Sequence, residues 1–198
     1  MRLTRGATSG DYSTDGGETM MADSQNQNKS VADVPPELAA RLVHGEINLA
    51  EFVGLTRETL YEIAQVGYQF FTSGRVEQAR QIYRGLVAAD PFDSVFHCHL
   101  AAAHHRLGEL DAAEQEYTKA LRFNIANADA LAGRGEIFLQ NGRIAEAIAD
   151  LQKAIELDPA GERATTLRAR AVLLAMKNAA QQQQKQPAPT QTDAGGNV

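Results

Sequence analysis

The middle of the chain carries apolar residues at helical spacing, broken at regular intervals by glycine and proline. Three stretches each read as a turn, one amphipathic helix and a stop: SGRVEQARQIYRGLVAADP at 73–91, LGELDAAEQEYTKALRFNI at 107–125 and NGRIAEAIADLQKAIELDP at 141–159. Each of these helices follows another apolar segment of helical character. The pattern therefore predicts pairs of helices joined by short turns.

Five sequence columns recur with a step of 34 residues. They hold a small residue, a turn glycine, a second small residue, a large side chain and a closing residue: Gly67, Ala101 and Gly135; Gly74, Gly108 and Gly142; Ala79, Ala113 and Ala147; Tyr83, Tyr117 and Leu151; Pro91, Ile125 and Pro159. A 34-residue period with this order of residues is the tetratricopeptide pattern. It predicts three units, at 60–93, 94–127 and 128–161.

The residue types in these columns have a physical reason. Glycine and alanine at a helix crossing let two backbones approach closely, and large side chains such as Phe70 and Tyr83 fill the space around the contact. Each turn glycine lets the chain leave the first helix through a left-handed conformation at little steric cost. The Asp-Pro pairs at 90–91 and 158–159 end the second helices, because proline has no amide donor.

We therefore predict an all-α fold: a right-handed superhelix of three tetratricopeptide repeats with an N-terminal helix and a C-terminal capping helix. Residues 34–59 are a helical lead-in and candidate dimerisation element, in which a helix opens at Pro36 and stops at Gly45. Residues 162–180 are the capping helix, and its apolar side is expected to be Leu167, Ala171, Leu174 and Ala175. The polar ends, 1–33 and 181–198, are expected to be disordered.

Stacked helix pairs create a concave surface lined by the first helices, and this surface is the predicted binding groove. Positions two, five, nine and twelve of each unit face it: Tyr61, Ala64, Tyr68 and Phe71 in the first unit, Val95, Cys98, Ala102 and His105 in the second, and Asp129, Ala132, Glu136 and Leu139 in the third. Such a groove is long enough for an extended peptide or a helix. The alternative is that Tyr68 and Phe71 pack as core against the N-terminal helix.

The composition restricts the class of function. A net charge of −6 and a pI near 5.4 argue against nucleic-acid binding through phosphate neutralisation. The single cysteine, Cys98, cannot form an internal disulfide. Residues 1–28 hold no apolar run that a secretion signal needs, and no stretch of about 18 apolar residues predicts a membrane span. We expect a cytoplasmic protein without stable membrane insertion.

The run HCHLAAAHH at 97–105 raises the hypothesis of a metal site. Two ligands on one helix need a spacing of three or four residues, and no histidine or cysteine pair here has it. His97 and His104 stand in columns that large core residues normally fill, so packed neutral imidazoles are the simpler interpretation. The chain also lacks a nucleophile elbow, a phosphate loop and a zinc-protease helix. We expect no enzyme activity, no cofactor and no metal.

The segment GEINLAEFVGLTRETLYEIAQVGYQFFTSGRVEQARQIYRGLVAADPFDSVF at 45–96 resembles the class II chaperones of type III secretion systems. The specific part is the lead-in GxxxLxxxxGLTxETL, which ordinary tetratricopeptide arrays do not share. The resemblance implies a groove that holds an extended segment of a hydrophobic translocator, with aromatic side chains accepting its apolar anchors. The family's three groove aromatics fall on Ala64, Tyr68 and Phe71, so two match, and Tyr61 lies one turn earlier. It also implies homodimers formed through residues 36–53, whereas the HLAAAHH helix departs from the glycine-rich version usual in the family.

The leading hypothesis is thus a cytoplasmic chaperone that keeps a secretion translocator soluble before export, without nucleotide or metal. The alternative is a generic scaffold that joins components of an unrelated bacterial assembly. A clamp for chaperone tails is disfavoured, because such clamps resemble arrays with Lys and Asn at the inward positions where this chain has Ala64 and Tyr68.

Overall fold

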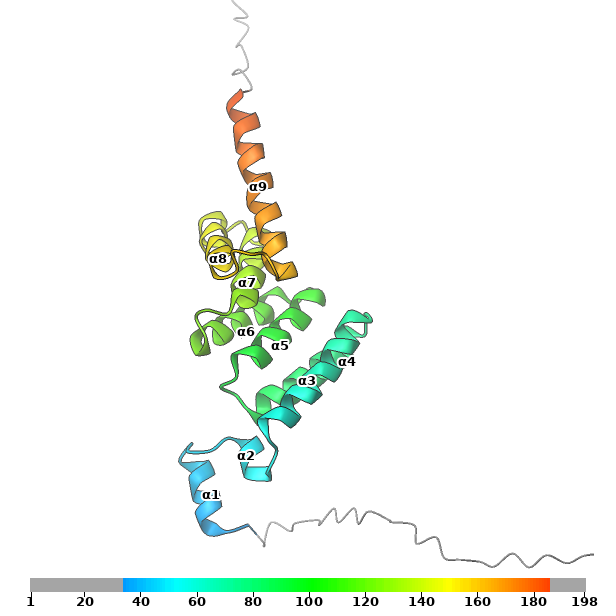
Figure 1. Ribbon diagram of the computed structural model, residues 1–198, viewed down its shortest axis with the longest axis vertical. Helices are drawn as coiled ribbons and strands as arrows, with labels where there is room; N and C mark the ends of the chain where they lie inside the picture. Colours follow the sequence, from blue (N-terminus) through cyan, green and yellow to red (C-terminus); the bar gives the residue numbers. More distant parts are fainter. Residues whose placement is uncertain (1–33, 186–198) are drawn as a thin grey trace, which may run out of the picture. The chain divides into compact units, whose positions relative to one another are not determined.

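The computed structural model describes residues 34–185, with side chains as far as Gln182. All regular structure in this range is helical (Figure 1): α1 (Pro36–Val43), α2 (Leu49–Val53), α3 (Arg57–Thr72), α4 (Val76–Ala89), α5 (Ser94–Arg106), α6 (Leu110–Phe123), α7 (Ala128–Gln140), α8 (Ile144–Leu157) and α9 (Ala164–Lys185). The segments 1–33 and 186–198, where we expected disorder, lie outside the described residues. Among the helices from α1 to α9, none combines the length and apolar character that crossing a membrane needs.

Helices α3 to α8 form three antiparallel pairs that stack in chain order (Figure 1). Within each pair the first helix packs along the second, and each second helix also packs against the first helix of the next pair. Helix α9 packs on both α7 and α8 at the end of the array. The all-α tetratricopeptide fold predicted from the 34-residue period is therefore confirmed.

The small-residue columns lie where the paired helices touch. A Cβ atom on Gly67 would stand 2.7 Å from Cε1 of Tyr83, and one on Gly135 would stand 2.9 Å from Cγ of Leu151. The alanines of the second helices, Ala79, Ala113 and Ala147, are completely buried. Any larger residue at these crossings would force the helices apart.

The turns inside the units are built as predicted. Gly74, Gly108 and Gly142 follow the first helices with φ angles of +83°, +79° and +72°, a conformation that residues with a Cβ rarely adopt. Helices α2 and α3 also begin at stabilised ends: Asn48 and Glu51 form a reciprocal capping box on α2, and the Thr56 hydroxyl caps α3.

Polar caps hold neighbouring first helices in register. The Asp93 carboxylate accepts hydrogen bonds from the amides of Val95 and Phe96 at 2.7 and 3.3 Å. Asn127 caps α7, and its side-chain amide donates to the Ser94 hydroxyl at 2.9 Å. The start of α7 is thereby tied to the start of α5.

Helix α9 differs from the prediction in two ways. It continues to Lys185, so the first five residues of the predicted tail are helical. Its predicted apolar side also faces outward, since Leu167 and Leu174 are 52% and 59% exposed and Ala171 and Ala175 are exposed too. The buried side carries Thr166 and Ala169 instead.

The Asp158 carboxylate explains this orientation of α9. It accepts hydrogen bonds from the backbone amides of Gly161, Glu162 and Arg163, and the Thr166 hydroxyl also donates to it. The pKa of Asp158 is held at about 2, first by the Thr166 hydroxyl and then by these amides. Because Thr166 must point at Asp158, Thr166 and Ala169 face the array, whereas Leu167 and Leu174 face away.

Candidate peptide-binding groove

The twelve predicted groove residues follow helices α3, α5 and α7, and we call their side of the array the first-helix face. They differ widely in exposure. Tyr68 and Tyr61 are 48% and 36% exposed. Half-buried side chains are Phe71, Val95, Ala102, His105, Asp129, Glu136 and Leu139, whereas Ala64, Cys98 and Ala132 are buried.

The buried members belong to the core. Ala64 lies in one apolar cluster with Leu60 and Phe96, and Cys98 and Ala132 lie in a second with Tyr117. Burial raises the pKa of the Cys98 thiol, so it is a neutral core group. These three positions support the face from below, and any contact with a partner falls to their exposed neighbours.

Tyr61 is held in place by its surroundings. Its hydroxyl donates to Asp93 Oδ2 at 2.9 Å, and its ring centroid lies 5.2 Å from that of Phe96. The Arg57 guanidinium lies 5.7 Å from the same ring and 3.3 Å from Asp93 Oδ2. Tyr61 therefore presents a fixed aromatic edge beside the junction of α3 and α5.

Tyr68 and Phe71 are the more available aromatic pair. They are three residues apart on α3, so they share one side of the helix. Phe71 packs partly on the core cluster of the first unit, and the Arg106 guanidinium from α5 lies 5.4 Å from its ring centroid. Tyr68 keeps nearly half of its surface exposed, which is more than a core side chain keeps.

The third unit offers acidic groups that already have partners. Asp129 accepts hydrogen bonds from Arg163 and Thr165, and Glu136 accepts one from Arg168 at 3.1 Å. The first-helix face therefore changes from aromatic at α3 to ion-paired at α7.

One part of the interpretation of the histidine run is wrong. His97 was predicted to be neutral, yet its Nδ1 lies 2.6 Å from Glu116 Oε2 and its Nε2 lies 2.9 Å from the Pro91 carbonyl oxygen. Two acceptors require two N–H donors, so the ring is an imidazolium. Burial alone would lower the pKa of His97, but these two hydrogen bonds raise it above its usual value.

The other three histidines of the run also have protein partners. His104 Nδ1 contacts the Glu109 carboxylate, His105 Nε2 lies 2.9 Å from Gln140 Nε2, and the His99 ring stacks on Tyr83. Burial lowers the pKa values of His99 and His105. Between residues 34 and 185, no three His, Cys, Asp or Glu side chains are grouped so that they could hold a metal ion.

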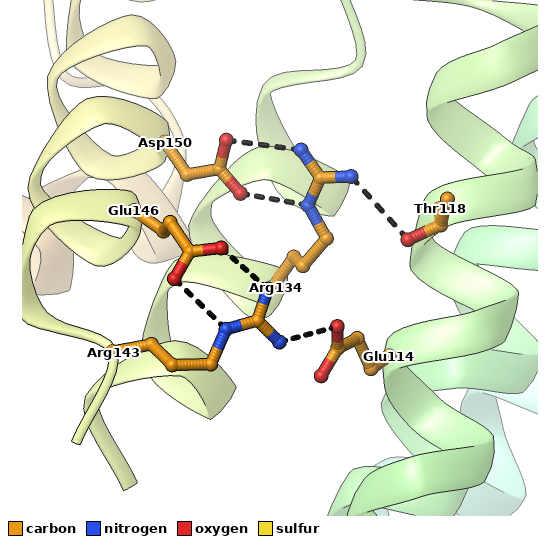
Figure 2. A network of polar contacts seen from close by, with 6 residues as sticks. All are labelled: Glu114, Thr118, Arg134, Arg143, Glu146 and Asp150. Atoms are coloured by element: carbon orange, nitrogen blue, oxygen red, sulfur yellow. Dashed lines mark hydrogen bonds and ion pairs between the residues drawn. The ribbon is translucent and has the colours of Figure 1, made fainter. Parts of the chain in front are cut away.

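A shallow cleft between α6 and α8 is distinct from the predicted groove, and none of the twelve residues lines it. Figure 2 shows that its polar walls are paired with one another. Arg134 donates to both oxygens of Asp150 at 2.7 and 3.0 Å and to Thr118 at 3.3 Å. Arg143 joins Glu146 at 2.6 and 2.9 Å and Glu114 at 2.7 Å.

This network connects the second unit to the third, and sequence reasoning missed it. The available signal was Arg134 itself, because the same column holds Val66 and Leu100 in the other units. An arginine in an apolar column predicts a buried acidic partner, and Asp150 is only 8% exposed. The cleft is thus an inter-repeat contact whose charges are already satisfied.

Known proteins resemble parts of the chain, including its repeats. Two protein-family models, each described as tetratricopeptide repeat, match residues 67–128 and 128–160 of the chain. Low calcium response locus protein H of Yersinia pestis is 28% identical over 103 residues, which cover 52% of this chain and 61% of the relative. RNA polymerase II-associated protein 3 of Xenopus tropicalis is 32% identical over 103 residues, but these cover only 16% of that protein.

Among solved structures, PcrH of Pseudomonas aeruginosa in complex with the chaperone binding region of PopD is 26% identical. The match covers 64% of this chain and 97% of that chain with a TM-score of 0.56. The chain is a tetratricopeptide-repeat protein. Within that class it is similar to the class II type III secretion chaperones, the family that its lead-in sequence resembles.

Proposed function

We propose that the chain is a cytoplasmic chaperone that binds an extended apolar segment of a type III secretion translocator along its first-helix face. The observation that carries the proposal is an aromatic pair on α3, the exposed Tyr68 and the half-buried Phe71, in an array similar to this family. Translocators must enter membranes after export, and their apolar segments aggregate in water unless they are covered. The chaperone acts by binding alone.

The surface chemistry supports an apolar ligand at the first unit. A few aromatic anchors supply most of the binding energy in typical interfaces, and Tyr68 offers such an anchor on a rigid helix. The ring of Tyr61 extends the aromatic surface by two turns of α3. Asp129 and Glu136 of the third unit are engaged by Arg163, just before α9, and by Arg168 of α9, so they do not leave unpaired charges against an apolar segment.

Co-expression tests the proposal directly. The full chain, tagged, is expressed with each hydrophobic translocator encoded beside its gene, and a translocator is expected to co-purify and to precipitate when the chain is omitted. Replacing Tyr68 and Phe71 together by alanine should abolish co-purification while helical content and melting temperature stay nearly unchanged. A matched control is Phe92→Ala, since Phe92 is 63% exposed but lies in the turn between α4 and α5.

Two results would overturn the proposal. If no translocator co-purifies with the wild-type chain, the assigned ligand is wrong. If the double alanine variant melts far below the wild type, the two rings are core and not a binding surface.

The second candidate is a generic scaffold, favoured by the similarity to RNA polymerase II-associated protein 3, which covers 103 residues of the chain. A scaffold would join two folded components and would not change the solubility of either. The precipitation arm of the same experiment therefore separates the two functions.

A further inference from the structure

The Tyr83 hydroxyl is a buried polar group without a partner. Tyr83 on α4 is only 1% exposed, and its hydroxyl finds no hydrogen-bond partner among the described residues. An unsatisfied buried hydroxyl is unfavourable for folding, and phenylalanine would fill the same space without this cost. A tyrosine at this position therefore indicates a use for the oxygen outside the folding of the free chain.

The phenol passes through the array from the second helices towards the first-helix face. Its ring atoms Cε1 and Cζ lie 2.7 and 3.0 Å from where a Cβ of Gly67 would stand, so the ring packs directly on α3 at this glycine. On the other side the ring stacks on His99 of α5, with centroids 5.0 Å apart and planes inclined by 14°. The hydroxyl is thereby directed between two first helices.

The phenol of Tyr68 is close enough to that of Tyr83 to act on it electrostatically. Burial raises the pKa of Tyr83 to about 12, with a smaller contribution from the neighbouring Tyr68 phenol. The hydroxyl is therefore neutral and able to donate. Tyr68 follows Gly67 in sequence and exposes 48% of its surface, so its ring stands on the solvent side of the crossing where the Tyr83 ring packs.

We propose that the Tyr83 hydroxyl donates a hydrogen bond to a main-chain carbonyl of the bound translocator segment, reached when the Tyr68 ring moves aside. This inference rests on the proposed function. An extended segment carries a carbonyl at every residue and has no internal partners for them. A neutral acceptor fits the surroundings, because the ring of Tyr83 and its neighbours Leu60, Ala64 and Ala79 form an apolar cluster in which a charged group would be strongly disfavoured.

The second unit supplies a matched control. Tyr117 occupies the same column and passes Gly133 just as closely, with Cζ 2.3 Å from where a Cβ would stand. Its hydroxyl is not among the buried groups without a partner. The variants Tyr83→Phe and Tyr117→Phe therefore remove the same atom, but only the first removes a completely enclosed donor without a partner.

The test uses the full chain and a labelled synthetic peptide, the shortest segment of the co-purifying translocator that still binds. Fluorescence anisotropy should show that Tyr83→Phe raises Kd by about 3- to 10-fold, the effect of one lost hydrogen bond. The melting temperature of the free Tyr83→Phe chain should stay equal or increase. Tyr117→Phe should change Kd by less than about 2-fold, because it removes no donor of this kind.

An amide-to-ester scan of the peptide identifies the acceptor, since an ester carbonyl accepts hydrogen bonds less well than an amide. One ester should weaken binding to the wild-type chain and have no further effect on Tyr83→Phe, which is the non-additivity expected of groups in contact. Wild-type binding with an unchanged Kd for Tyr83→Phe, an equal loss for Tyr117→Phe, or strict additivity at every ester position would overturn the inference. Failure of the wild-type chain to bind any translocator would instead overturn the proposed function.

Discussion

His97 carries a positive charge inside the array because both of its ring nitrogens face acceptors. The histidine run itself gave no indication of this charge. Glu116 lies 19 residues away on another helix, and only the packing of α5 against α6 brings the carboxylate to the ring. Burial alone would raise the pKa of Glu116, but its hydrogen bonds to His97 and Lys119 lower it, which agrees with an ion pair.

The charge on His97 makes stability depend on pH. The pKa of His97 is higher in the folded chain than the value of about 6.5 expected when unfolded. Its contribution to the free energy of unfolding is therefore complete below about pH 6.5. The contribution is lost as pH rises through the folded pKa. His99 and His105 act in the opposite direction, since burial lowers their pKa values and their contribution is lost as pH falls.

Comparing the wild type with His97→Gln isolates the contribution of His97 to the pH dependence of stability. Urea unfolding should show a difference in free energy of unfolding that is largest near pH 5.5 and shrinks towards pH 8.5. A difference that stays constant across this range would contradict a charged His97.

Sequence columns predicted single residues well where one geometric need decides the residue type. Gly74, Gly108 and Gly142 are required by positive φ, and Ala79 by a helix crossing. Predictions of exposure were weaker, because Ala64 and Cys98 stand at groove positions but are too short to reach past their neighbours. The orphaned Tyr83 hydroxyl had no sequence signal, since a large residue is expected in its column in any case.

At the scale of elements, the contact of α3 with α4 depends on Gly67, whereas another glycine of α4 touches nothing. Gly67→Ala places a methyl group 2.7 Å from a Tyr83 ring atom and should lower the free energy of unfolding by about 1–3 kcal/mol. Gly85→Ala has no atom within 4 Å of the new Cβ and should raise it by up to about 1 kcal/mol, because alanine is the better helix former. Thermal or urea unfolding of both variants checks the two opposite signs, and an unchanged stability for Gly67→Ala would contradict the close crossing.

Helix α9 shows why the orientation of an element is harder to predict than its existence. Its apolar residues form a clear stripe, and a capping helix normally turns such a stripe inward. Here the polar contacts of Asp158 with Thr166 and three amides decide the rotation, and Arg170 adds hydrogen bonds to the carbonyls of Asp158 and Pro159. These contacts depend on a loop geometry that periodicity does not encode.

At the scale of the whole molecule, the N-terminal helices expose apolar side chains that the described part of the chain does not cover. Val43, Leu49 and Val53 are 84%, 45% and 58% exposed. We expect residues 36–53 to form a homodimer, so light scattering after gel filtration should give twice the 21.4 kDa of one chain. Val53→Glu should shift the mass to one chain, because pairing would bury an unpaired charge.

Leu167→Glu is the control for this prediction, since Leu167 is 52% exposed at the opposite end of the array. It should leave the dimer intact. Dissociation by Leu167→Glu alone would place the interface at α9.

The charged contacts between units carry one more consequence. Between the first two units Arg80 meets Glu109 at 2.8 Å, whereas between the second and third Glu114 meets Arg143 at 2.7 Å. Arg80 and Glu114 share one column, and Glu109 and Arg143 share another, so the polarity of the junction is reversed from one to the next. Excising 94–127 would set Arg143 against Arg80 and Arg134 against Arg84. The repeats look interchangeable in their glycines and alanines, yet the alternating charge pattern at these junctions fixes their order along the chain.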